Sequence, residues 1–195
     1  MPVKGERTQQ HILESAQKVF LQKGFAATSI TDLMAAAGVT KGSLYFHFDS
    51  KEQIGLAVLE RARESFMAFL EDSLQGDSPG QSLENFLQRA CDHHGRAAFI
   101  GGCLFGNTAL ETSDTEPVYA RFVAQVFAEW REKLEAVITK AQQAGQVRSD
   151  IGAGEMAQFV ISVLEGSIMQ ARLYKEGRPL TDGANTLRRL LDLRF

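Results

Sequence analysis

The sequence is poor in residues that interrupt helices or cross-link a chain. Only four prolines occur among 195 residues, and three of them (Pro79, Pro117 and Pro179) stand where a helical chain needs breaks. Two cysteines are too few for a disulfide framework or a zinc cluster, so we expect reduced thiols. No segment alternates polar and apolar residues in the way a strand does. These scarcities favour an all-α fold.

Long apolar runs are also missing. The longest uncharged stretch, residues 97–110, is shorter than the roughly 20 residues that a membrane-spanning helix needs. The first ten residues, MPVKGERTQQ, are polar and lack the apolar run of a signal peptide. We therefore expect a soluble, cytoplasmic protein that does not insert into membranes. The hydrophobic fraction of 44% excludes a disordered chain.

Excess positive charge is missing from the chain as a whole, since the formal net charge is −3. The charge is unevenly distributed. Residues 1–51 contain six Lys or Arg against four Asp or Glu, a net charge of +2, whereas the other 144 residues contain 15 against 20, a net charge of −5. This asymmetry has the sign expected of a nucleic-acid-binding head on an acidic body.

What the sequence does contain is helical periodicity along almost its whole length. Ser50 and Gln53 form a predicted capping box, in which each side chain satisfies a backbone amide of the other residue. Helix boundaries follow from glycines, prolines and caps. About nine helices are expected: before Gly24, between Thr28 or Ser29 and Gly38, at about 40–47 and 51–75, and near 80–96, 102–113, 116–144, 153–176 and 183–193.

The segment over residues 40–47 is too short to be stable as an isolated helix. A tight turn, AGVT (residues 37–40), joins it to the preceding helix, which predicts a helix-turn-helix whose second helix enters the DNA major groove. Val39, Leu44 and Phe48 are expected to pack inward. The side chains or backbone left outward are those of Thr40, Lys41, Gly42, Ser43, Tyr45 and His47.

These outward residues suit contact with DNA. Lys41 can donate to guanine acceptors or to phosphate, and Gly42 permits close approach at a cost of about 1 kcal/mol in helix propensity. Tyr45 and His47 are expected to hold phosphates and fix the register. Lys51, with the amides at the start of the next helix, would add an anion site.

The run TSITDLMAAAGVTKGSLYFHFDSKEQI resembles the N-terminal domain of the tetracycline-repressor family of bacterial transcriptional regulators. The resemblance covers roughly residues 8–55 and centres on G-V-x-x-G-x-L-Y-x-H-F-x-x-K. It implies a non-enzymatic regulator with a DNA-binding head over residues 1–50 and an effector-binding and dimerisation domain over 51–195, without a cofactor. The DNA-contact roles that it implies fall on Thr28, Thr40, Lys41, Gly42, Ser43, Tyr45, Phe46, His47 and Lys51.

Two interpretations of the head stay open at this point. The three helices could form a packing module only, although an outward lysine, serine, tyrosine and histidine on one short helix favour DNA contact. Phe46 fits either the core or a contact with the DNA backbone.

One head covers one half-site, so we expect a homodimer on a palindromic operator in double-stranded DNA. The helix over 153–176 has apolar residues on more than one face, as a subunit interface or a buried helix pair within one subunit would. By the resemblance, this helix and the last one form the dimer interface. The candidate interface residues are Phe159, Val163, Gly166, Ser167, Met169, Leu173, Leu187 and Leu191.

The resemblance also implies a pocket for a small-molecule effector among the central helices, whose occupancy releases a repressor from its operator. The sequence supplies many apolar side chains for such a pocket, most of which must be core. The candidate effector-binding residues are Phe66, Phe99, Cys103, Leu104, Asn107, Phe127 and Trp130.

Cys103 follows Gly101 and Gly102 and is expected in the first turn of a helix, where free amides and the helix dipole favour a thiolate. The segment through Glu111 resembles a subgroup of the family with a Gly-Cys-Leu start to the central helices. Cys103 is thus a candidate sensor of oxidants or electrophiles. The alternative is a small buried apolar side chain.

Other chemistries fit less well. His93 and His94 are adjacent on a helix and point about 100° apart, so with Cys91 and Cys103 they do not predict a metal site. A Cys-His hydrolase would need a third orienting group that we do not find. A DNA-binding module controlled by a protein partner instead of a small effector remains an alternative.

Overall fold

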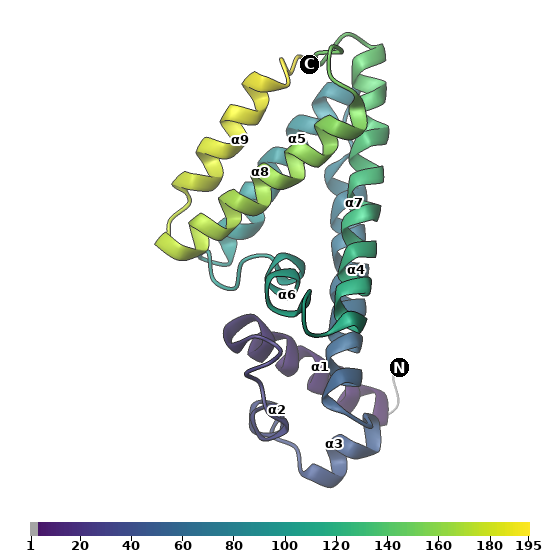
Figure 1. Cartoon of the computed structure of the whole chain (residues 1–195), viewed down its shortest axis with the longest axis vertical. Helices are drawn as coiled ribbons and strands as arrows, with labels where there is room; N and C mark the ends of the chain where they lie inside the picture. The colour runs from purple at the N-terminus through teal and green to yellow at the C-terminus, as the bar shows by residue number, and fades with distance from the viewer. Residues whose placement is uncertain (1–3) are drawn as a thin grey trace. The chain divides into compact units, whose positions relative to one another are not determined.

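The computed structural model describes residues 4–195, so the first three residues of MPVKGERTQQ lie outside it. Over the described residues the chain folds into nine helices and no strands, as the sequence predicted (Figure 1). The helices are α1 (Lys4–Lys23), α2 (Ile30–Ala37), α3 (Lys41–His47), α4 (Lys51–Ser73), α5 (Pro79–Arg96), α6 (Leu104–Thr112), α7 (Pro117–Gln143), α8 (Ala153–Tyr174) and α9 (Arg178–Leu190).

Short polar side chains and glycines set the ends of the first helices. The Ser29 hydroxyl accepts the amide N–H of Asp32 at 3.1 Å, and the Asp32 carboxylate accepts the amide N–H of Ser29 at 2.9 Å. These reciprocal bonds form a capping box at the start of α2. Gly38 ends α2 in the left-handed conformation, with φ of 60°. The predicted boundaries of α2 are thus confirmed.

The predicted capping box at α4 forms only by half. The Ser50 hydroxyl accepts the amide N–H of Gln53 at 3.1 Å, as expected. The side-chain oxygen of Gln53 instead accepts the N–H of Asp49 at 2.5 Å, one residue earlier than predicted. The helix still gains both capping bonds.

The predicted start of the last helix, near residue 183, was wrong. Helix α9 begins at Arg178, and Pro179 lies in its first turn. We had interpreted the segment around Pro179 as a break. Because the first turn of a helix has no use for the N–H that proline lacks, proline there starts a helix as readily as it ends one.

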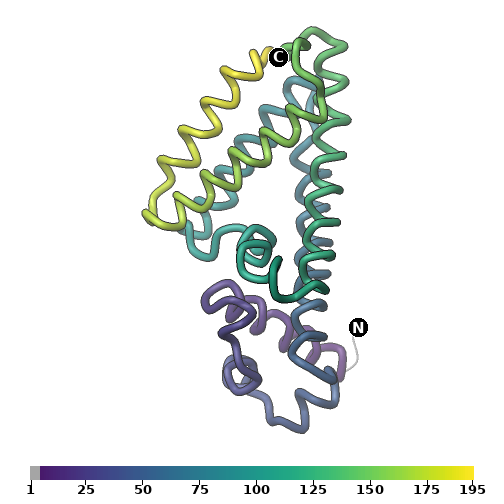
Figure 2. Tube along the Cα trace, in the orientation of Figure 1, coloured from purple at the N-terminus to yellow at the C-terminus, as the bar shows by residue number. Residues whose placement is uncertain are grey.

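The described residues divide into two compact units. Unit 1 contains residues up to Glu64 together with Leu104–Val123, and Figure 2 follows its chain through α1, α2 and α3. Helix α6 and the start of α7 therefore group with the DNA-binding head by compactness, and the expected boundary at residue 50 stays a prediction. The buried apolar side chains of unit 1 include Ile12, Ala16, Phe20, Phe25, Leu33, Leu44, Phe48, Ile54, Val58 and Tyr119.

Unit 2 comprises Ser65–Cys103 and Ala124–Phe195, with one apolar core contributed by α4, α5, α7, α8 and α9. Helices α8 and α9 lie side by side in it (Figure 1). The Arg188 guanidinium donates two bonds, of 2.7 and 2.8 Å, to the Glu84 carboxylate, which fastens α9 to α5. A paired, partly buried arginine of this kind fixes geometry well because both N–H groups are matched.

The structure corrects three of the predicted dimer-interface residues. Leu187 and Leu191 are buried in the core of unit 2, with exposed fractions of 0% and 3%. Ser167 is also buried, because α9 approaches it so closely that a Cβ on Gly183 would lie 2.3 Å from its hydroxyl oxygen. The small residue at 167 thus admits a helix of the same subunit. The sequence showed correctly that a helix approaches, but not which one.

Two kinds of feature are absent from residues 4–195. No helix there is long and apolar enough to cross a membrane. Nor do these residues contain a cluster of three or more His, Cys, Asp or Glu side chains suited to hold a metal ion.

Candidate nucleic-acid interface

Helix α3 has one buried face and one exposed face. Leu44 and Phe48 are buried, with exposed fractions of 0% and 3%, so both side chains face inward as predicted. The Thr40 hydroxyl caps the helix by accepting the N–H of Ser43 at 3.2 Å. Phe46 is 81% exposed. The core interpretation of Phe46 is therefore wrong for this chain, and its contact with the DNA backbone stays a prediction.

The open surface of α3 combines positive charge with aromatic rings. The Lys41 ammonium lies 5.9 Å from the ring centroid of Tyr45, one turn further along the helix. The Phe46 ring meets the His47 ring edge-on at 5.0 Å. A Cβ added to Gly42 would meet no atom within 4 Å. The fold therefore does not require a glycine at this position.

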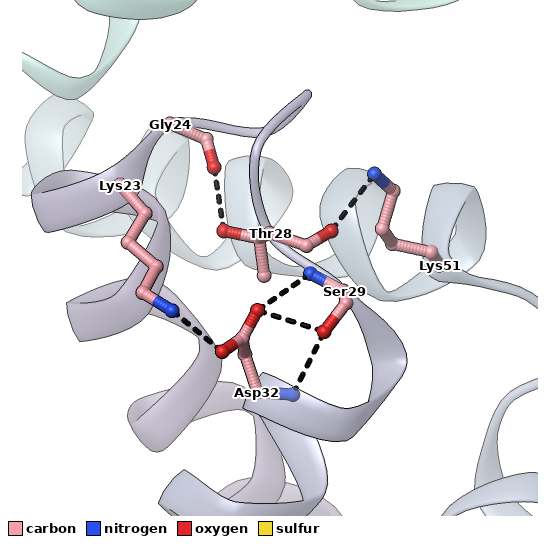
Figure 3. A network of polar contacts seen from close by, with 6 residues as sticks. All are labelled: Lys23, Gly24, Thr28, Ser29, Asp32 and Lys51. Carbon is pink, nitrogen blue, oxygen red and sulfur yellow. Dashed lines mark hydrogen bonds and ion pairs between the residues drawn. The ribbon is translucent and has the colours of Figure 1, made fainter.

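Thr28 does not lie on this surface. Its side chain is 1% exposed, and its hydroxyl donates a 2.6 Å bond to the carbonyl of Gly24 (Figure 3). The expected direct DNA contact by the Thr28 side chain is therefore not available in this conformation. Thr28 instead closes the turn between α1 and α2, hereafter the α1–α2 turn (residues 24–29).

Lys51 also faces inward. Its ammonium group donates to the carbonyl oxygens of Phe25 at 2.9 Å, Thr28 at 3.0 Å and Ala26 at 3.4 Å. Figure 3 shows the bond to Thr28. A lysine ammonium has three N–H donors, and here all three are used on the α1–α2 turn. The predicted anion site at Lys51 is thus occupied by backbone carbonyls.

A residue that we did not single out as a contact lies on the other side of the same turn. The Glu111 carboxylate of α6 accepts the amide N–H of Phe25 at 2.9 Å and of Ala26 at 2.7 Å. The paired residues are 86 and 85 positions apart in the sequence. No local pattern signals such a contact, and only the fold brings it together.

An exposed ion pair supports the start of α2. The Lys23 ammonium lies 2.5 Å from the Asp32 carboxylate, which also accepts the backbone N–H and the hydroxyl of Ser29 (Figure 3). The pKa of Asp32 lies well below its ordinary value of 3.8. The hydrogen bond from Lys23 is the largest cause, and the two bonds from Ser29 come next. Asp32 therefore caps α2 as a carboxylate.

Five of the seven candidate effector residues belong to unit 2. The Trp130 ring meets Phe66 edge-on at 5.0 Å and lies 5.9 Å from Phe127. Phe99 and Cys103 pack against the same core. Leu104 and Asn107 belong to unit 1, and Leu104 is buried there.

We expected Cys103 in the first turn of a helix. In the structure it lies one residue before α6. The thiol is hydrogen-bonded to Glu165 of α8, a residue that we had not singled out. Burial raises the pKa of Glu165 above 4.5, and the bond from Cys103 opposes this shift. The sequence did contain a signal for this residue, because Glu165 is the only charged residue in the run QFVISVLEGSIMQ.

Two buried polar atoms of unit 2 have no hydrogen-bond partner: the indole Nε1 of Trp130 and the Oε1 of Glu165. Buried polar groups in folded proteins are nearly always paired, so each unpaired one needs an explanation. One is a donor and the other an acceptor. Each adds an unpaired polar atom to the interior of unit 2.

Two family models match this chain, one over its first helices and one over its later helices. Residues 12–58 match the family model described as bacterial regulatory proteins of the tetR family. Residues 79–187, more than half of the chain, match the model of the tetracyclin repressor-like C-terminal domain. The chain belongs to the tetracycline-repressor family. It is accordingly a DNA-binding transcriptional regulator and not an enzyme.

Curated relatives within the family match over most of their length. The HTH-type transcriptional repressor DhaR of Mycobacterium sp. (strain GP1) is 30% identical over 178 residues, which cover 88% of this chain and 85% of DhaR. The transcriptional regulator AcuR of Cereibacter sphaeroides is 28% identical, over 92% of this chain and 83% of AcuR. The repressor NemR of Escherichia coli (strain K12) is 27% identical, over 89% and 88%.

Solved structures agree with the family assignment. A TetR transcriptional regulator from Chloroflexus aurantiacus superposes with a TM-score of 0.89 at 32% identity, covering 97% of this chain and 96% of that one. A TetR-family regulator from Cytophaga hutchinsonii gives a TM-score of 0.87 at 30% identity, covering 98% and 96%. The predicted architecture of a helix-turn-helix head with a helical C-terminal domain is thus confirmed.

The Asp32 network yields a prediction about pH. Asp32→Asn should lower the midpoint of thermal unfolding near neutral pH, because the variant lacks the charged bond to Lys23. A carboxylate whose pKa is depressed by folding stabilises the protein above its ordinary pKa, and the effect is lost as pH falls toward the depressed value. The gap between wild type and variant should therefore narrow below pH 3.8. Circular dichroism melts at a series of pH values measure this.

Lys23→Met is the matched control, since it removes the main cause of the pKa shift and leaves the Ser29 bonds in place. When Lys23→Met is present, the difference in unfolding midpoint between the proteins with and without Asp32→Asn should depend less on pH. A gap that keeps the same size from neutral pH to about pH 2 contradicts the assignment.

Proposed function

We propose that the protein is a homodimeric repressor that reads a palindromic operator through α3 and leaves it when a small hydrophobic or reactive effector binds in unit 2. The observation that carries this proposal is the exposed surface of α3. Lys41, Gly42 and Tyr45 are exposed, and Phe46 is 81% exposed, so the packing of the chain does not account for these side chains. Their chemistry suits a partner.

DNA is the partner that fits these side chains. Lys41 lies at the N-terminal end of α3, the end that meets base edges in a helix-turn-helix, and its ammonium suits guanine O6 and N7. Tyr45 and His47 suit phosphate oxygens, which fix the register. The open space over Gly42 leaves room for the DNA backbone or a base edge.

A dimer follows from apolar side chains left outside the core. On α8, Phe159, Met169 and Leu173 have exposed fractions of 47%, 52% and 66%, and Leu190 of α9 has 45%. A hollow of about 490 Å³ lies beside them, lined in part by Ile151, Phe159 and Leu190. A two-fold axis through this face would bury the same patch on both subunits. Of the predicted interface residues, Val163 and Gly166 are half-buried and remain candidates.

The effector site is supported by the composition around Trp130. The rings of Phe66 and Phe127 lie against the indole, and an effector that inserted among these rings would bury apolar surface. The unpaired Nε1 of Trp130 and Oε1 of Glu165 would find partners in an effector that carries both an acceptor and a donor. The effector class is therefore a small, mainly apolar molecule with a polar end.

A second way to release the operator is modification of Cys103, and a separate observation supports it. Cys103 is hydrogen-bonded to a buried carboxylate, Glu165, so its thiol proton has an acceptor at hand when sulfur reacts. We therefore keep the alternative that an oxidant or electrophile modifies Cys103. The third alternative, a DNA-binding module controlled by a protein partner, predicts that no small apolar compound shifts the melting temperature.

The DNA-reading role is tested by fluorescence anisotropy on duplexes from the DNA flanking the gene. Lys41→Ala should cost about 1–3 kcal/mol on the preferred operator and less on variants at the guanine it reads. Tyr45→Ala should weaken binding to every variant by a similar factor. Equal losses for Lys41→Ala on all operator variants contradict base reading by Lys41. A wild type that binds no flanking duplex better than random DNA contradicts the repressor proposal.

The dimer is tested by Phe159→Asp. A charge on the exposed apolar face should convert the dimer into a monomer in sedimentation velocity experiments and weaken operator binding about a hundredfold. Gln125→Asp on α7, an exposed position outside this face, is the control and should leave the dimer intact. A Phe159→Asp protein that still sediments as a dimer rules out this face.

The thiol mode is tested by diamide, which oxidises accessible thiols. Operator binding by the wild type should fall and return when a thiol reductant is added, whereas Cys103→Ser should bind DNA normally and ignore diamide. Cys91→Ser is the control, because burial raises the pKa of that thiol and makes it less reactive. A Cys103→Ser protein that still responds to diamide excludes the sensor role.

A further inference from the structure

Two charged side chains bind the backbone of the same two residues, one through the N–H groups and the other through the carbonyl oxygens. Phe25 and Ala26 donate their amide N–H groups to the Glu111 carboxylate, at 2.9 and 2.7 Å. Their carbonyl oxygens accept from the Lys51 ammonium, at 2.9 and 3.4 Å. Glu111 comes from α6 and Lys51 from α4, and both lie in unit 1.

The arrangement matches the polarity of the backbone. The positive N–H ends of the peptide units face a carboxylate, and the negative carbonyl ends face an ammonium. Hydrogen bonds with an ionised partner are roughly twice as strong as neutral ones. The turn is therefore fixed by opposite charges on its two sides, and loss of either charge leaves backbone groups of the turn without their partner.

Gly24 makes the close approach possible. Its φ is 84°, a conformation that residues with a side chain rarely adopt. A Cβ at this position would lie 2.6 Å from both oxygens of the Glu111 carboxylate. Glycine here thus meets two requirements at once: the left-handed turn after α1 and the space for the carboxylate.

The α1–α2 turn positions the helix-turn-helix. It leads directly to the buried Thr28 and to Ser29, the residue that caps α2. The Phe25 ring is buried in the same turn and stacks on Phe20 at 4.2 Å. Because α2 is joined to α3 by a tight turn at Gly38, a shift of the α1–α2 turn moves the DNA-reading helix.

We infer that Glu111 is a positioning residue for DNA binding: with Lys51 it clamps the α1–α2 turn and so sets the orientation of α3. This inference rests on the proposed function of α3 as the operator-reading helix. It also reassigns Lys51 from a phosphate contact to a member of the clamp. Neither residue needs to touch DNA for its loss to weaken operator binding.

The sign of the effect separates a clamp from simple electrostatics. Removing a negative charge from a DNA-binding head should, by Coulomb attraction alone, strengthen DNA binding or leave it unchanged. The clamp predicts the opposite for Glu111. Asp114→Asn provides the matched control, because it removes one negative charge from an exposed position three residues further along.

The experiment measures operator affinity by anisotropy at several salt concentrations, at a temperature where circular dichroism shows each variant folded. Glu111→Ala should bind about tenfold more weakly, with an unchanged salt slope, and Glu111→Gln should fall between it and wild type because one acceptor remains. Lys51→Met should lose a similar factor, also with an unchanged slope. The double variant should be no weaker than the weaker single variant, because both changes release the same turn.

Amide hydrogen exchange supplies a readout that does not depend on DNA. The amides of Phe25 and Ala26 should be protected in the wild type and exchange at least tenfold faster in Glu111→Ala, but not in Asp114→Asn. If the wild type bound no operator, the proposed function would fail, and this result would still decide whether the clamp exists. Unchanged protection in Glu111→Ala overturns it.

Two further results contradict the inference. Glu111→Ala that binds the operator as tightly as wild type, or more tightly, shows that the turn does not position α3. A salt slope that falls by about 1 in Lys51→Met, with losses that multiply in the double variant, shows that Lys51 contacts a phosphate and acts independently of Glu111.

Discussion

The head of this regulator depends on the anchoring of a helix that cannot stabilise itself. Helix α3 has seven residues, and isolated helices shorter than about 12–15 residues are marginal in water. Its conformation therefore comes from the burial of Leu44 and Phe48 and from the cap at Thr40. This dependence frees the opposite face for recognition. It also means that a change in the buried residues that hold α3 would alter the surface that we propose to contact DNA.

Local patterns predicted the helices well because capping and hydrophobic spacing are local. Helix α2 was expected to start at Thr28 or Ser29 and to end at Gly38, and the structure shows Ser29 and Gly38 as its caps. A helix end needs a side-chain acceptor at its start and often has a left-handed residue at its end. Pro179 was misread, because proline serves equally as a break and as a first-turn residue. Local sequence cannot separate these two uses.

The candidate site was predictable only where side chains point outward from one helix. The exposed face of α3 follows from helical periodicity. Whether Thr28 and Lys51 face DNA or the protein depends on a turn that is held by Glu111, which comes from a distant helix. For the same reason Leu187 looked like an interface residue: an apolar stripe does not indicate which neighbour covers it.

The buried indole of Trp130 has a practical consequence for the study of this regulator. It is the only tryptophan in the chain, and it lies among Phe66 and Phe127 with its N–H unpaired. Its fluorescence therefore reports on this group of side chains and on no other part of the protein. An acceptor that arrives at the indole N–H would shift the emission without any label. The protein thus contains its own optical probe for effector screening.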